Sequence, residues 1–258
     1  MEEQQEAIRW NEVADLYDSF VQATFDLPFW LEEAGKAGGE ILELMCGTGR
    51  VSLPLLEAGA RLTCVDNAPE MLARLQDKLR GRELSATVCQ MDVRELSLPR
   101  HYDLAIVPFH AFAELTSPDD QRRTLSGIHR HLTGTGRLIL TLHNPPVRLQ
   151  SVDGVMRLWA NYPLTENGEK RLLWGAETRG PETGVVTGIE TFEIYDSRGQ
   201  MLSRRMLEFR FRLLERHRFE ALAEEAGFAV EALYGDYAYG AFQEECSRFL
   251  IYVLRKKG

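Results

Sequence analysis

The stretch LELMCGTGRVSL, residues 42–53, places two glycines one residue apart between two apolar segments. The apolar residues before the glycines are typical of a short buried strand, and residues 51–58 have the pattern of a helix. Gly59 then stands where a C-terminal cap is expected. Because Gly47 and Gly49 carry no Cβ, a ligand can approach the backbone closely, and the start of the helix directs free N–H groups to the same place. The stretch therefore predicts a strand, a ligand-binding loop and a helix.

The loop does not have the pattern of the common phosphate-binding loops. A dinucleotide-binding loop reads G-x-G-x-x-G, but Ser52 stands at its third glycine position, and the Gly-Lys-Ser/Thr of a P-loop is absent. Glu43 lies inside the preceding strand, and a carboxylate there would repel a pyrophosphate and attract a sulfonium or an ammonium. A cationic ligand is therefore favoured.

Strand and helix patterns alternate along the first 142 residues and predict an α/β fold. This alternation is typical of a doubly wound, mostly parallel sheet with helices on both faces. A late helix and two further strands complete a seven-stranded sheet. The expected strands are 41–45, 62–65, 86–90, 104–107, 137–142, 229–234 and 249–254, and the expected helices are 51–58, 69–79, 120–132 and 219–226.

A second pattern interrupts this alternation after the fifth strand. Leu207, Phe209, Phe211 and Leu213 alternate with charged residues, which is typical of a half-buried antiparallel strand, and the turn at 196–199 precedes it. We expect an antiparallel β-hairpin insertion.

The domain organisation follows from these patterns. The chain is expected to form a single domain, 1–258, whose N-terminal part has helical periodicity over 11–35. Residues 1–35 would form a helical lid, and the insertion at 150–215 would serve as a substrate lid or a dimer contact.

Taken together, the motifs resemble those of class I S-adenosylmethionine-dependent methyltransferases of the small-molecule type. The segment ELMCGTG (43–49) resembles the family's first motif, E/D-x-x-x-G-x-G. The segments VDNAPEML (65–72), MDV (91–93), DLAIVPFH (103–110) and GTGRL (134–138) resemble later motifs in order and spacing. One departure is Ala68, which replaces the usual serine at a helix cap; Asn67 is a substitute. The resemblance implies a Rossmann-like methyltransferase fold and S-adenosylmethionine as the cofactor.

The resemblance also implies roles for individual residues. Asp66 would bind the two ribose hydroxyls, Glu43 would hold the methionyl ammonium, and Tyr17 on the first helix would lie near the methionyl part. Arg50 would contact the cofactor carboxylate or cap the loop, and Met71 would pack beside the adenine. The other cofactor-binding positions are Cys46, Gly47, Thr48, Gly49, Asn67, Met91, Asp92, Val93 and Pro108.

Methyl transfer from a sulfonium is an in-line displacement, so alignment of the nucleophile alone supplies much of the acceleration. His110 and His143 follow strand ends and are the candidate catalytic bases, although the reaction does not require one. The expected activity is transfer of a methyl group to an O, N or C atom of a small-molecule acceptor.

Composition narrows the class of partner. The net charge of −9 argues against nucleic acid, and no apolar run is long enough to span a membrane. The first six residues, MEEQQE, are unlike a signal or transit peptide. The four cysteines form no Cys-x-x-Cys pair, so we expect neither a metal site nor disulfides, and we expect a cytoplasmic protein. The partners expected are a small-molecule acceptor and at most a second copy of the chain.

Three alternatives remain open. An NAD-dependent oxidoreductase is disfavoured by Glu43 and Ser52. A nucleic-acid or protein methyltransferase is disfavoured by the charge and by VPFH (107–110), which stands where some related families have Asn/Asp-Pro-Pro-Tyr/Phe. A scaffold that binds the cofactor without catalysis is the third.

Overall fold

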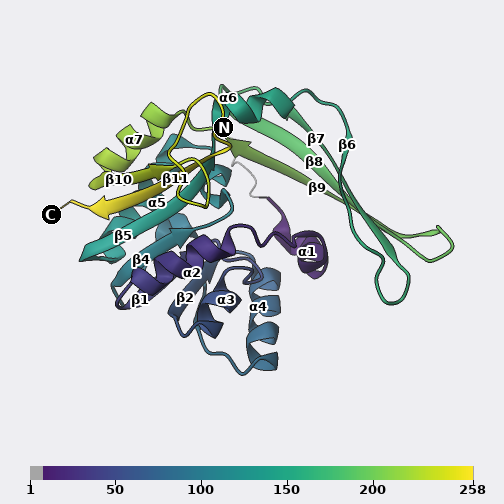
Figure 1. Cartoon of the computed structure of the whole chain (residues 1–258), viewed down its shortest axis with the longest axis horizontal. Coiled ribbons are helices and arrows are strands. Elements are labelled where there is room, and N and C mark those ends of the chain that lie inside the picture. Colours follow the sequence, from purple (N-terminus) through teal and green to yellow (C-terminus); the bar gives the residue numbers. More distant parts are fainter. Residues whose placement is uncertain (1–7, 258) are drawn as a thin grey trace, which may run out of the picture.

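The computed structural model describes residues 8–257, and the first seven residues of the expected lid and Gly258 lie outside the described part. Within that part the chain builds a seven-stranded sheet covered by helices and a separate four-stranded sheet (Figure 1). The expected α/β fold with a β insertion after the fifth strand is confirmed.

The seven-stranded sheet, sheet A, has the order β10-β11-β5-β4-β1-β2-β3. Strands β1 to β5 run parallel, and β11 is antiparallel to both of its neighbours. The strands are β1 (Glu40–Leu44), β2 (Arg61–Asp66), β3 (Thr87–Gln90), β4 (Tyr102–Val107), β5 (Leu132–His143), β10 (Phe228–Tyr234) and β11 (Phe249–Lys256). The carboxyl ends of β1, β2 and β4 therefore meet at one edge, where open α/β sheets bind ligands.

Helices cover both faces of sheet A because the buried side chains of its strands are apolar on both sides. One face is covered by α2 (Leu27–Lys36), α3 (Ser52–Glu57) and α4 (Pro69–Gly81), and the other by α5 (Pro118–His131) and α7 (Arg216–Glu225). Short helical turns connect these elements: η2 (Val93–Glu95), η3 (Ala111–Glu114), α6 (Pro145–Arg148) and η4 (Leu149–Ser151).

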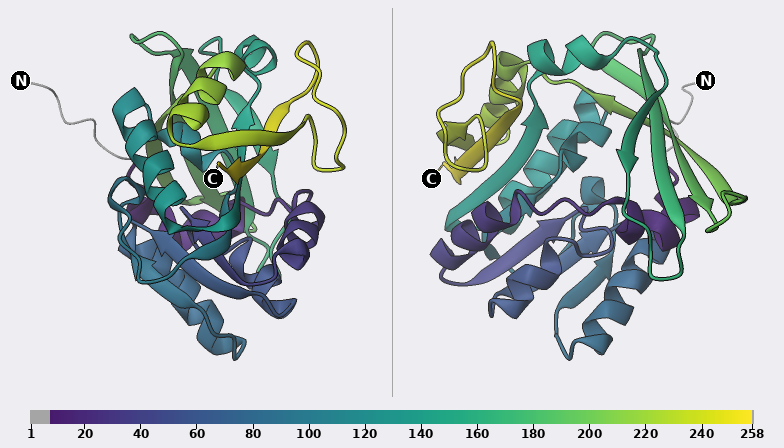
Figure 2. Two further views of the ribbon diagram at one scale, coloured as in Figure 1. Left: turned by 90° about the vertical axis from the view of Figure 1, so that its left-hand side faces the viewer. Right: turned by 45° about the vertical axis from the view of Figure 1, so that its right-hand side comes forward.

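The insertion is larger than a single hairpin. The predicted hairpin is β8 (Val185–Tyr195) with β9 (Met201–Arg212), and β6 (Arg157–Asn161) and β7 (Lys170–Arg179) extend it to an antiparallel sheet, sheet B, with the order β6-β7-β8-β9. Residues of β8 and β9 pack through Phe192 and Leu207 against residues 8–26, which we call the N-terminal segment. The right-hand view of Figure 2 shows sheet B arching over this segment.

The single helix expected over 11–35 is interrupted. The segment contains η1 (Trp10–Val13) and α1 (Ala14–Phe20), and a linker leads to α2. Pro28 lies in the first turn of α2, where its missing N–H costs nothing, but it cannot continue a helix from α1. The interruption lets α1 turn away from sheet A and pack under sheet B.

None of the helices in residues 8–257 combines the length and apolar character that crossing a membrane requires.

Candidate active site

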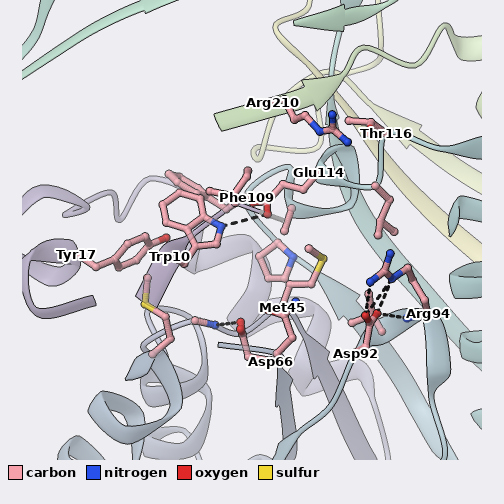
Figure 3. A pocket seen from close by; sticks show the side chains of 18 of the residues that line it. Trp10, Tyr17, Met45, Asp66, Asp92, Arg94, Phe109, Glu114, Thr116 and Arg210 are labelled. Carbon is pink, nitrogen blue, oxygen red and sulfur yellow. Dashed lines mark hydrogen bonds and ion pairs between the residues drawn. The ribbon is translucent and has the colours of Figure 1, made fainter. Parts of the chain in front are cut away.

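A cavity of about 290 Å³ lies at the carboxyl ends of the sheet A strands, between the glycine loop, the N-terminal segment and sheet B. Figure 3 shows its side chains converging from these elements. Its volume is near the lower end of the roughly 300–1,000 Å³ common for small-molecule sites. Among the residues expected to bind cofactor, the cavity is lined by Tyr17, Gly47, Asp66, Asn67, Met71, Met91, Asp92, Val93 and Pro108.

Asp66 joins the ends of β1 and β2 at the floor of the cavity. Its Oδ2 accepts a 2.8 Å hydrogen bond from the N–H of Gly47, and its Oδ1 accepts a 2.9 Å bond from the N–H of Ala68. Burial raises the pKa of the Asp66 carboxyl, and these backbone bonds oppose that shift. Since each carboxylate oxygen has a second lone pair, Asp66 can still accept two hydrogen bonds from a diol.

The two loop glycines have different surroundings. Gly47 has a φ of +55°, and a Cβ built on it would meet nothing within 4 Å. Gly49 has a φ of +86°, and its Cβ would lie 2.4 Å from Cδ1 of Leu75. The open approach for a ligand is therefore at Gly47, whereas Gly49 is required by the packing of the loop on α4. The expectation that Gly49 also admits a ligand stays a prediction.

Asp92 and Arg94 close the opposite end of the cavity. The guanidinium of Arg94 donates to both Asp92 oxygens and also pairs with Asp120. These bonds hold the pKa of Asp92 below its usual range. Met91 and Val93 lie beside them and give this end an apolar wall.

Glu43 is buried behind the loop and does not line the cavity. Its Oε2 accepts a 2.6 Å hydrogen bond from the hydroxyl of Ser52, and burial raises its pKa to about 7. The hydroxyl of Ser52 is therefore the hydrogen-bond partner of the Glu43 carboxylate. This role explains why a serine stands where a dinucleotide-binding loop has its third glycine.

The other loop residues that were expected to contact cofactor are also turned away from the cavity. Arg50 forms a bidentate pair with Asp26, at 2.6 and 2.7 Å, and lies over the ring of Phe109. Thr48 donates a 2.5 Å hydrogen bond to Asp18. Cys46 is buried beside Cys64. These contacts tie the loop to the N-terminal segment.

His110 and His143 stack on each other with ring centroids 3.7 Å apart, and neither lines the cavity. Burial, with a contribution from Arg148, lowers the pKa of His110 to about 3, and burial beside His110 lowers that of His143. A base with so low a pKa takes up a proton poorly near neutral pH. The geometry therefore does not support the role of catalytic base expected for these two residues.

The N-terminal segment closes the cavity through residues that the sequence did not single out. The indole N–H of Trp10 donates a 3.1 Å hydrogen bond to Glu114, and the Trp10 ring meets Tyr17 edge-on at 5.8 Å (Figure 3). Burial raises the pKa of Glu114 to about 7, against the effect of this bond.

Two charged side chains of the cavity wall, Glu190 on β8 and Arg210 on β9, have no ion-pair or hydrogen-bond partner within residues 8–257. Arg210 also lines a second, more open cavity along sheet B, so it marks where the two meet. The sequence could have indicated Glu190, because it lies on the same strand face as the apolar Phe192, where an acidic residue is unusual.

No group of three or more His, Cys, Asp or Glu side chains in the described part of the chain is arranged to hold a metal ion.

The family model of the methyltransferase domain matches residues 41–153, which run from β1 to η4 and carry much of the cavity wall. Residues 41–153 therefore belong to the methyltransferase domain family. The fold, the order of sheet A and the cavity at the strand ends agree with this membership.

Two curated methyltransferases and one solved structure illustrate the similarity. A glycine/sarcosine N-methyltransferase of Halorhodospira halochloris is 34% identical over 139 residues, 53% of this chain and 51% of that protein. A cypemycin N-terminal methyltransferase of Streptomyces sp. is 30% identical over 168 residues, 65% of this chain and 66% of that protein. The matches thus span about half to two thirds of these relatives. An S-adenosylmethionine-dependent methyltransferase of Clostridium acetobutylicum shares the fold, with a TM-score of 0.81, 19% identity, and coverage of 96% of this chain and 99% of that one.

The cavity fits the family's cofactor. The open space over Gly47 accommodates a ligand against the backbone, and Asp66 keeps lone pairs for the ribose hydroxyls. Met71 and Met91 provide soft apolar surfaces for a purine. When bound, S-adenosylmethionine supplies an electrophilic methyl group on a positively charged sulfur.

Proposed function

We propose that the chain transfers the methyl group of S-adenosylmethionine to a nitrogen atom of a small-molecule acceptor. The observation that carries the proposal is one cavity in which Asp66 and Gly47 form a cofactor wall and acidic and aromatic side chains of the N-terminal segment, η3 and sheet B form the opposite wall. The two curated relatives are a glycine/sarcosine N-methyltransferase and a cypemycin N-terminal methyltransferase, which supports the choice of nitrogen.

In this proposal the cofactor lies across the ends of β1, β2 and β3, with its ribose on Asp66 and its adenine toward Asp92. The acceptor lies beneath sheet B, next to Glu114 and Glu190. Residues 8–20 and sheet B cover both ligands and exclude water, which protects the reacting atoms and strengthens the electrostatic interactions between them.

The acceptor would reach this place along the second cavity, past Arg210. The proposal includes a cytoplasmic location, since the four cysteines are free thiols, as is usual in a reducing compartment. A homodimer stays a prediction, which sedimentation of the purified chain would test.

The test is transfer of a labelled methyl group from S-adenosylmethionine to a panel of glycine, sarcosine and other aliphatic amines. We expect at least one amine to be methylated, with S-adenosylhomocysteine as the second product. Calorimetry with S-adenosylhomocysteine and with NAD is the parallel control, in which only the former should bind. A chain that binds S-adenosylhomocysteine but methylates only oxygen or carbon acceptors, or none, would contradict the nitrogen assignment.

A further inference from the structure

Glu190 occupies a position from which it can meet the acceptor. It projects from the middle of β8, where it is paired in register with Gly175 of β7 and Leu207 of β9, so both neighbouring strands fix its backbone. Two residues along the same strand face, Phe192 packs edge-on against Phe20 with ring centroids 5.0 Å apart. A site residue held in this way keeps its position without a hydrogen bond of its own.

The surroundings of Glu190 are acidic and phenolic. Tyr17 on α1 and Glu114 on η3 line the same cavity as Glu190. Burial raises the pKa of these two side chains and of Tyr162, which follows β6, and the negative charge of Glu190 adds to each shift. On β7 its neighbour is Glu177, which forms a buried ion pair with Arg148. Arg148 is thus occupied, and no cation within residues 8–257 pairs with Glu190. A cationic ligand would supply the missing partner, since an unpaired carboxylate in a partly buried site is costly.

We propose that Glu190 holds the ammonium group of an amine acceptor and removes the proton that blocks its attack on the methyl group. This inference rests on the proposed function and names the proton acceptor within it. The carboxylate of Glu190 and the acceptor ammonium become a carboxylic acid and a neutral amine. The nitrogen lone pair then forms a bond to the methyl carbon, the bond from that carbon to sulfur breaks, and its electron pair stays on sulfur. The methylated product leaves as an ammonium, and Glu190 returns its proton to water.

The electrostatics of the site suit this transfer. Burial and the charge of Glu177 raise the pKa of Glu190 to about 7, which brings it closer to the pKa of an amine. The positive sulfur beside the acceptor disfavours a second positive charge and lowers the pKa of the ammonium. The two values therefore converge, and a base whose pKa lies near the working pH is the most effective.

The experiment uses the full chain and the amine that the wild type methylates best. Glu190→Gln removes the charge and keeps the shape, Glu190→Asp keeps a base at a shorter reach, and Glu166→Gln makes the same charge change on the exposed loop between β6 and β7. For each variant, kcat and KM for the amine are measured from about pH 6 to pH 10, and S-adenosylhomocysteine affinity is measured by calorimetry.

We expect Glu190→Gln to lose about 10²-fold or more in kcat at pH 7, within the range usual for a general base. The loss should shrink as the pH approaches about 10, near the pKa of a free alkylamine, because the amine then arrives unprotonated. Glu190→Asp should retain part of the activity and the wild-type pH dependence. Cofactor affinity and the activity of Glu166→Gln should stay at wild-type values.

A Glu190→Gln variant with an unchanged pH profile and kcat within twofold of the wild type would overturn the inference and leave the proposed function standing. A rise in KM alone would likewise reject the proton transfer, since it would indicate binding only. A wild type that methylates no amine would overturn the proposed function, and the assignment of Glu190 with it.

Discussion

The backbone N–H of Gly47 donates a 2.8 Å hydrogen bond to Oδ2 of Asp66, which joins the loop after β1 to the end of β2. Each carboxylate oxygen keeps a second lone pair, both residues line the cavity, and the space above Gly47 is open. The position of the proposed cofactor depends on this relationship.

Asp66→Asn should weaken S-adenosylhomocysteine binding by about ten- to a hundredfold. The amide keeps the shape of the side chain but loses the charge-assisted hydrogen bonds to ribose, worth about 1.5–3 kcal/mol. Calorimetry gives the affinity, with Asp77→Asn on the exposed face of α4 as the matched control. An affinity within twofold of the wild type, in a folded variant, would remove Asp66 from the ribose site.

Gly47→Ala and Gly49→Ala should separate binding from folding. At Gly47 the added methyl enters open space, so the cost to stability is about 1–2 kcal/mol for a left-handed residue, while S-adenosylhomocysteine binding is lost. At Gly49 the methyl also meets Leu75, so the free energy of unfolding should fall by about a further 1–3 kcal/mol. Denaturant unfolding and calorimetry test both, and the reverse ranking would show that the loop faces the ligand through Gly49.

Glu43→Gln should change the pH dependence of stability. Burial raises the folded-state pKa of Glu43 to about 7, above its ordinary value of 4.5, so the folded chain binds this proton more tightly than the unfolded chain. The free energy of unfolding of the wild type should therefore fall as the pH rises from about 4.5 to about 7.

In Glu43→Gln this contribution is absent, so its curve should be flatter than that of the wild type over the same window. S-adenosylhomocysteine affinity should change less than about threefold, because Glu43 is behind the loop. If the two stability curves are instead parallel and S-adenosylhomocysteine affinity falls strongly, Glu43 contacts the methionyl ammonium, as the sequence predicts.

Trp10→Phe should loosen the cover of the cavity. The ring is retained, but the hydrogen bond to Glu114 is lost, and a bond to a charged group is worth about 1.5–3 kcal/mol. Stopped-flow measurement should show faster release of S-adenosylhomocysteine, and Trp159→Phe on β6 should not. Equal release rates in both variants would mean that the N-terminal segment does not cover the ligand.

The parallel sheet and the Asp66–Gly47 corner could be predicted because their signals are local. A strand that ends in an acid and a loop with two glycines are each visible within a few residues. Trp10 and Glu114 gave no such signal, since 104 positions separate them and only the folded chain brings them together. The role of Arg50 was likewise set by a distant residue, Asp26, which occupies its guanidinium.

Sheet B was only half predictable. The alternation of β9 identified the hairpin, but β6 and β7 carry little alternation, and pairing with β8 decides their conformation. The sequence marks Glu190 as an unusual acid on an apolar strand face, but its place in the cavity depends on sheet B arching over the N-terminal segment, which the sequence alone does not show.

A crystal structure of the chain with S-adenosylhomocysteine would show directly whether Asp66 binds the ribose of the cofactor. We expect the ribose hydroxyls within hydrogen-bond distance of Asp66, the adenine beside Met71 and Asp92, and the sulfur facing the side of the cavity that holds Glu190. A ligand bound outside this cavity, or within it but without contact to Asp66, would contradict the assignment of the cofactor site.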